Sequence, residues 1–206
     1  KANESMDDKL SRRFVLANAL YAENADASAA AHELYQANEA NPEALDASVR
    51  YLVLKNEVKN YGSKELLEKL IKAYQTTSNS SYKTDLRVAV TSTKDPELVK
   101  LVISKFEDAD TVKPQDLRGW YAGVLGNDAG EQAAWDWLRN DWSWLEKTVG
   151  GDMEFTTFIT VTANVFKTAN RLAEFKEFFE PKLNVPGFER EIKMDTNVIA
   201  SRVALI

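Results

Sequence analysis

The sequence contains no cysteine, a single histidine and only eight glycines among its 206 residues. Without cysteine the chain can form no disulfide, no thiolate nucleophile and no cysteine-based zinc site. No apolar run approaches the roughly 20 residues of a membrane-spanning helix, and the polar segment 1–13 lacks the apolar core of a secretory signal. We therefore expect a cytoplasmic protein with no membrane partner.

An excess of basic residues is also absent. The formal net charge is −6, the isoelectric point is near 5.0, and the lysines and arginines are scattered among acids. Because nucleic-acid binding needs a basic surface, we expect no nucleic-acid partner. The chain does not begin with methionine, which suggests a processed chain or an excised part of a longer protein.

Apolar residues recur at helical rather than alternating spacing through most of the sequence. Asn41–Glu43 and Asp95–Glu97 each place a capping side chain before a proline, which predicts a helix start. The spacing predicts about ten to twelve helices, with 128–147 forming one helix or two. The expected helices cover residues 6–24, 26–39, 42–60, 63–77, 80–92, 95–108, 114–125, 128–147, 152–166, 168–180 and 186–203.

The segment 155–166 is the best strand candidate because it is rich in β-branched residues. Phe155, Ile159, Thr162 and Phe166 nevertheless recur at helical spacing, and no partner strand is obvious. We therefore predict a helix here.

Many short helices that each bury a single stripe must stack on their neighbours. The expected fold is all-α, an irregular α-solenoid of stacked antiparallel helix pairs, which is a superhelix like those of HEAT and armadillo repeats. No low-complexity linker divides the sequence. We therefore expect one helical-repeat domain over residues 1–206.

Four of the five tryptophans lie within residues 135–144. On a helix, Trp135 and Trp142 share one stripe, which we predict to be core. Trp137 and Trp144 lie together on a different side, where a boundary contact or an interface is expected. This pattern favours packing over a stacking platform for a ligand.

Two short motifs resemble peptidase signatures but depart from them at essential positions. Residues 32–36, HELYQ, differ from the zinc motif H-E-x-x-H at Gln36, which cannot replace the second imidazole. We interpret His32 as a surface histidine. Residues 151–155, GDMEF, resemble G-x-M-E-N with Phe155 in place of asparagine, and Asp152 is expected to cap the next helix. The sequence therefore assigns no catalytic residue, no metal ligand and no cofactor to this chain.

Residues 113–147, KPQDLRGWYAGVLGNDAGEQAAWDWLRNDWSWLEK, together with FKTANRLAEFKEFFEPK at 166–182, carry a family resemblance. They are similar to the C-terminal helical domain of M1-family zinc aminopeptidases, and among its subfamilies most to the aminopeptidase N of lactic-acid bacteria. The closing segment 190–206 fits the last helix of that domain. Over residues 1–112 the resemblance is only architectural.

The resemblance implies a division of labour within a longer polypeptide. An upstream catalytic domain would hold zinc and cleave the first residue from peptides. This chain would be its non-catalytic C-terminal domain, closing over the cleft and shaping the peptide chamber. Gln115, Asp116 and Arg118 are the candidate chamber residues, although a helix cap with local ion pairs explains them equally well. Trp137 and Trp144 are the candidate contacts with the catalytic domain.

Two other functions remain open from the residues alone. A free-standing helical-repeat adaptor would keep the fold and bind another protein with its concave face. An enzyme that uses two carboxylates for acid–base catalysis ranks third, because the sequence singles out no particular pair of acids. The reading frame separates the first two functions, because a peptidase encoded directly upstream supports the aminopeptidase domain and a start codon near Lys1 supports the adaptor.

Overall fold

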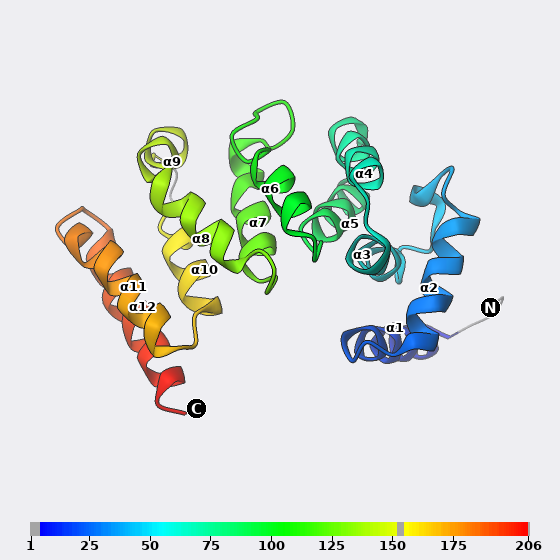
Figure 1. Ribbon diagram of the computed structural model, residues 1–206, viewed down its shortest axis with the longest axis horizontal. Helices are drawn as coiled ribbons and strands as arrows, with labels where there is room; N and C mark the ends of the chain where they lie inside the picture. Colours follow the sequence, from blue (N-terminus) through cyan, green and yellow to red (C-terminus); the bar gives the residue numbers. More distant parts are fainter. Residues whose placement is uncertain (1–4, 152–154, 206) are drawn as a thin grey trace. The chain divides into compact units, whose positions relative to one another are not determined.

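The computed structural model describes residues 5–151 and 155–205, and all regular secondary structure in these ranges is helical (Figure 1). The predicted all-α helical-repeat class is therefore confirmed. The helices within the described ranges are α1 (Met6–Tyr21), α2 (Ala25–Ala37), η1 (Pro42–Ala44), α3 (Arg50–Tyr61), α4 (Lys64–Thr76), α5 (Ser80–Val90), α6 (Pro96–Ile103), α7 (Pro114–Leu125), α8 (Glu131–Asn140), α9 (Trp142–Val149), α10 (Thr157–Val165), α11 (Ala169–Phe179), η2 (Glu180–Lys182) and α12 (Phe188–Val203).

The chain divides into two compact units, residues 1–111 and 112–206. The expectation of one continuous domain over 1–206 stays a prediction.

In the first unit, α3 and α5 form the central pair, with α2 packed on α3 and α4 packed on α5 (Figure 1). Their apolar stripes supply the core, because Val53, Leu54, Leu86 and Val90 are all fully buried. Gly62 ends α3 where the chain passes its own last turn. A Cβ at this position would lie 2.4 Å from the carbonyl oxygen of Val58, so only glycine fits.

A buried ion pair joins this unit's core elements. Arg50 Nε, at the start of α3, donates to Asp85 Oδ2 on α5 at 2.7 Å. Arg50 Nη1 donates to the carbonyl oxygen of Glu43 in η1 at 3.0 Å, and its guanidinium lies over the Tyr82 ring. The single side chain thereby ties η1, α3 and α5 together.

The helix predicted over 42–60 is wrong in its first half. Only the 3₁₀ turn η1 forms after Asn41, whose side chain makes no cap hydrogen bond. Leu45 then turns to an extended backbone with ψ of 145°, and Asp46 Oδ1 accepts hydrogen bonds from the backbone and the hydroxyl of Ser48. This local turn competes with helix, so α3 begins only at Arg50. The prediction at Asp95 is confirmed, because its side chain caps α6 through the N–H of Glu97.

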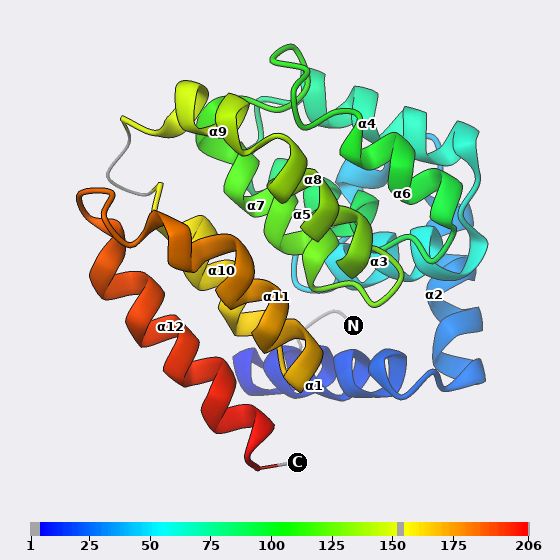
Figure 2. The ribbon, with the colours of Figure 1, turned by 60° about the vertical axis from the view of Figure 1, so that its left-hand side comes forward.

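In the second unit, α10 packs on α12 and α7, and α11 lies beside α12 (Figure 2). The segment 155–166, the strand candidate, is helical as predicted, and α10 occupies most of it. Its Thr162 is fully buried and is hydrogen-bonded at 2.7 Å to the hydroxyl of Tyr121 on α7. Tertiary packing, together with the helical spacing of the apolar residues, thus overrides the β preference of its branched residues.

An aromatic cluster fills the centre of this unit. Trp135 on α8 and Trp142 on α9 are both buried, as predicted for the first tryptophan stripe. Each contacts the rings of Phe178 and Phe179 of α11, with ring centroids 5.5–6.0 Å apart; three of these four contacts are edge-on and the Trp135–Phe179 contact is tilted. The helix expected over 128–147 is broken at Asp141, so the two indoles belong to different helices.

Candidate functional site

The predicted chamber residues Gln115, Asp116 and Arg118 lie in the first turns of α7. Gln115 and Arg118 are exposed, whereas Asp116 is half-buried. Lys113 occupies the N-cap position without a side-chain cap hydrogen bond, and its carbonyl oxygen accepts from the N–H of Asp116 at 2.8 Å. The three side chains therefore share one helix start, and their role in a chamber stays a prediction.

The two predicted contact tryptophans pack against each other across the break between α8 and α9. Their ring centroids are 6.3 Å apart in an edge arrangement. Trp137 is 7% exposed and also contacts the Tyr121 ring, whereas Trp144 is half-buried. The exposure on which the prediction rested is therefore wrong for Trp137, because its own unit already covers it. Contact with another domain stays a prediction for both residues.

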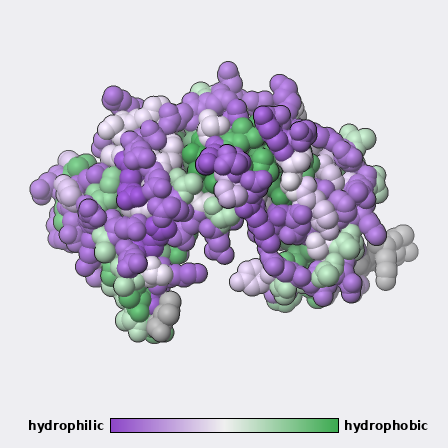
Figure 3. All heavy atoms as spheres, viewed as in Figure 1, coloured by the Kyte–Doolittle hydropathy of each residue, from purple (hydrophilic) through white to green (hydrophobic). Residues whose placement is uncertain are grey.

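Exposed apolar side chains gather instead on α1, where hydrophobic atoms reach the surface (Figure 3). Met6, Leu10 and Phe14 recur every four residues, and Tyr21 follows near the end of the helix; all four are at least 55% exposed. None of the residues of α1, all of which are described, is buried. We call these four residues the α1 apolar face. The four-residue spacing was visible in the sequence, but spacing alone does not reveal that a face lacks a covering partner.

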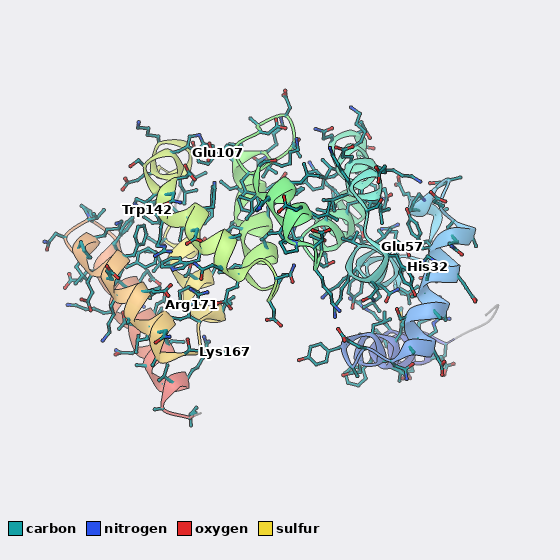
Figure 4. All side chains as sticks on the ribbon, viewed as in Figure 1. His32, Glu57, Glu107, Trp142, Lys167 and Arg171 are labelled. Carbon is teal, nitrogen blue, oxygen red and sulfur yellow. The ribbon has the colours of Figure 1, made fainter. Side chains whose placement is uncertain are left out.

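His32 is not a simple surface histidine, which corrects the sequence interpretation. Its Nδ1 lies 2.8 Å from Glu57 Oε2, and the two side chains meet between α2 and α3 (Figure 4). The ring stacks on Tyr61 with centroids 3.8 Å apart and planes 14° from parallel. Because an ionised carboxylate can only accept, Nδ1–H donates to Glu57. The carboxylate, 5% exposed, thereby fixes the orientation of the imidazole.

A pocket of about 300 Å³ opens beside this pair. Its charged lining consists of three carboxylates and one ammonium, supplied by Glu39, Glu57, Glu65 and Lys69. Tyr35 also lines the pocket and is 3% exposed, and its hydroxyl is buried with no hydrogen-bond partner among the described residues. We call this the His32 pocket. It lies wholly within the first unit.

The segment 166–182, which carried part of the resemblance, holds a structural network. Arg171 Nε donates to Glu131 on α8 and its Nη1 donates to Glu174, both at 2.7 Å. Trp135 Nε1 donates to the same Glu174 oxygen at 2.7 Å. These charge-assisted hydrogen bonds join α11 to α8, so the residues position helices.

Over residues 5–151 and 155–205, no group of three or more histidine, aspartate or glutamate side chains could hold a metal ion. Gln36 lines the same pocket as His32, but it supplies an amide where H-E-x-x-H needs an imidazole. Asp152 lies outside the described residues, so its predicted cap is not tested. Among the described helices, none is long and apolar enough to cross a membrane.

The fold and these surfaces define the class, which is an all-α helical-repeat protein. The sequence model of the ERAP1-like C-terminal domain family matches residues 1–201. The chain belongs to this family. It is 61% identical over its full length to aminopeptidase N of Lactobacillus helveticus and 54% identical to that of Lactobacillus delbrueckii subsp. lactis. A more distant relative is aminopeptidase M1 of Arabidopsis thaliana, 30% identical over 134 residues.

These comparisons confirm the resemblance to lactic-acid-bacterial aminopeptidase N and extend it. Because the two Lactobacillus matches cover 100% of the chain, the similarity includes residues 1–112, where only the architecture had looked alike. The chain spans 24% of the length of these relatives.

Proposed function

We propose that the chain is the non-catalytic domain of a longer zinc aminopeptidase, where it closes over the catalytic part and shapes the chamber that admits peptides. The observation that carries this proposal is the 61% identity over the whole chain to a protein named aminopeptidase N, of which the matched region is 24%. Because the match runs over the whole chain at this identity, we infer that the chain serves as the corresponding domain of an aminopeptidase. Helical repeats suit this role, because they provide an extended surface without a catalytic residue set.

The zinc of this proposal would be held by the remaining polypeptide. The residues of the look-alike motif do not fit the metal, since His32 Nδ1 is bound to Glu57 and Gln36 offers only an amide. This chain's own contribution is therefore to position the peptide and to limit which peptides enter the chamber.

The α1 apolar face supports the proposal because its exposed apolar side chains need a surface that covers them. An apolar helix face on a soluble domain is normally covered by another surface. The relatives carry about three times as much additional chain as is present here. We assign this remaining polypeptide of the same protein as the partner that covers Met6, Leu10, Phe14 and Tyr21.

The test compares the longer polypeptide that contains this chain with a version lacking residues 1–206. The substrates are an aminoacyl anilide, which needs only the catalytic part, and peptides of increasing length. We expect the ratio of kcat/KM for peptides to kcat/KM for the anilide to change by at least about tenfold, since chamber contacts act only on the peptide.

Two controls make the result interpretable. Bound zinc and the far-ultraviolet circular dichroism of the truncated enzyme establish that its catalytic part is folded. The chain alone is expected to hydrolyse no anilide. A folded, zinc-loaded truncated enzyme with an unchanged substrate ratio, or turnover by the isolated chain, would refute the proposal.

A further inference from the structure

The His32 pocket combines a negative surplus with a buried polar group that lacks a partner. Glu39, Glu57 and Glu65 face one ammonium, that of Lys69, and that ammonium is already paired with Glu39 at 3.1 Å. The potential in the pocket is therefore negative. Glu39 and Glu65 are exposed and screened by water and salt, whereas the buried Glu57 acts where that screening is reduced.

Glu57 is the deepest of these carboxylates. It is 5% exposed, and His32 is the hydrogen-bond partner that the described residues give it. An ionised carboxylate has about four acceptor positions, and a buried charge with so few partners is costly. Glu57 therefore has acceptor capacity left for a ligand that carries donors.

Tyr35 adds an independent indication. Burial, followed by the charges of Glu39 and Glu57, raises the pKa of Tyr35 to about 12. The phenol is therefore neutral, and its unpartnered oxygen lies in the field of two carboxylates. A buried hydroxyl in this position is stabilised by a donor that is also positively charged.

The remaining groups argue against an anion. The start of α4 lies in the lining, but the Ser63 side chain already accepts from the N–H of Leu66. Glu65 already occupies the first turn of the same helix, where its negative charge meets the positive end of the helix dipole. The Nδ1–H of His32 is donated to Glu57, so this donor is not free for an anion.

We propose that the His32 pocket binds a primary ammonium or guanidinium group, held by Glu57, the Tyr35 hydroxyl and the His32–Tyr61 stack. The cation can come from a lysine or arginine side chain of a peptide or from a free polyamine. Both sources share the donor chemistry that the pocket lacks. The inference rests on the first unit alone and is independent of the proposed aminopeptidase role.

The test uses the complete chain and the imidazole NMR signals of His32, which are unambiguous because it is the only histidine. The probes are N-acetyl-lysine methylamide and putrescine, titrated at constant pH and ionic strength. We expect saturable shifts with a dissociation constant on the order of 1 mM, as for a small ligand with one main charge contact. Tighter binding of putrescine would point to a free polyamine, and tighter binding of the lysine probe to a peptide side chain.

Three variants locate the binding. Tyr35→Phe removes only the hydroxyl and is expected to weaken binding roughly tenfold or more. Glu57→Gln keeps an acceptor for His32 Nδ1 but removes the charge, and is expected to abolish the shifts. Glu33→Gln, an exposed carboxylate on the same helix outside the pocket, is the matched control and should bind as the wild type does.

Specific outcomes would overturn the proposal. These are no saturable shift with either cation, an equal shift with the uncharged N-acetyl-norleucine methylamide, and tighter binding of acetate than of the lysine probe. Wild-type affinity in a folded Tyr35→Phe variant together with wild-type affinity in Glu57→Gln would do the same.

Discussion

At the scale of single residues, the buried charges are of two kinds: one forms an ion pair, and the other is a carboxylate with an unpartnered oxygen. Arg50 and Asp85 neutralise each other in the first unit. Asp195 on α12 is 2% exposed, and its Oδ2 has no hydrogen-bond partner among the described residues. Burial, followed by the nearby charge of Glu191, raises the pKa of Asp195 above its ordinary value, against the opposing effects of the Thr160 hydroxyl and Arg202. Ionised Asp195 therefore weakens the fold that the rest of α12 stabilises.

The first prediction concerns Asp195→Asn. Because the pKa of Asp195 is higher in the folded than in the unfolded state, its favourable contribution is complete below the ordinary value of 3.8 and is lost as the pH rises through the folded-state pKa. At pH 7 the amide removes a desolvated charge, so we expect the melting temperature to rise by about 2–4 °C. The gain should disappear near pH 3.

Thermal unfolding followed by tryptophan fluorescence measures this effect, with Glu189→Gln as the matched control. Glu189 is an exposed carboxylate on the same helix, so its substitution should leave the melting temperature almost unchanged. A drop in the melting temperature of Asp195→Asn at pH 7 would show that the ionised carboxylate stabilises the fold.

At the scale of elements, α1 differs from every other α-helix of the first unit. Helices α2 to α6 each bury at least two residues, whereas α1 buries none although it is among the longest helices of the chain. A helix of this kind depends on a partner for burial of its apolar face. Its capping box at Ser5 and Asp8 fixes where it begins.

The second prediction replaces Leu10 and Phe14 with glutamine in the longer polypeptide. The chain by itself should stay folded, with stability changed by about 0.5 kcal/mol or less, because both side chains are exposed. In the longer polypeptide the same change removes apolar contact, so we expect lower thermal stability of the enzyme and altered peptide cleavage.

Leu34→Gln is the control for this experiment, since Leu34 is an exposed apolar residue on α2 outside the α1 apolar face. The assignment of the face fails if the double variant and Leu34→Gln give the same melting temperature and the same peptide cleavage in the longer polypeptide. Unfolding of the isolated double variant would instead place these residues in a core.

At the scale of the whole molecule, spectroscopic probes are divided between the two units. All five tryptophans lie in residues 112–206, whereas the single histidine and six of the seven tyrosines lie in 1–111. The sequence predicts one continuous domain over 1–206, and such a domain should unfold as one cooperative unit. The division of probes makes this prediction measurable.

The third prediction uses Arg50→Ala, which breaks the buried pair with Asp85 and is expected to destabilise the fold by about 3–5 kcal/mol. In a single cooperative domain, the urea midpoint of unfolding followed by tryptophan fluorescence should fall by the same amount as the midpoint followed by the His32 NMR signals. Lys64→Ala, which removes a solvent-exposed ion pair with Glu68, should change neither urea midpoint. A lower midpoint for the His32 signals alone would show that the two units unfold as independent domains.

Much of the secondary structure could be predicted from the sequence because its signals are local. The capping residue Asp95 correctly predicted the start of α6. In 155–166, the helical spacing of the apolar residues predicted a helix correctly despite the β-branched composition. The prediction of a helix over 42–60 was wrong in its first half because the local turn at Asp46 and Ser48 competes with helix formation. The exposure expected for Trp137 was wrong because burial depends on neighbours such as Tyr121 and Trp144, of which only Trp144 is close in sequence.

The sequence by itself determined the all-α class, the tryptophan core and the family resemblance, since each follows from the identity and order of residues along the chain. Only the tertiary structure decided that His32 meets Glu57, 25 residues away, and that the described residues of the first unit leave the α1 apolar face exposed. The physical reason is distance along the chain. Propensity and capping act over a few residues, whereas a pocket requires groups from separate helices, brought together by packing that spacing alone does not specify.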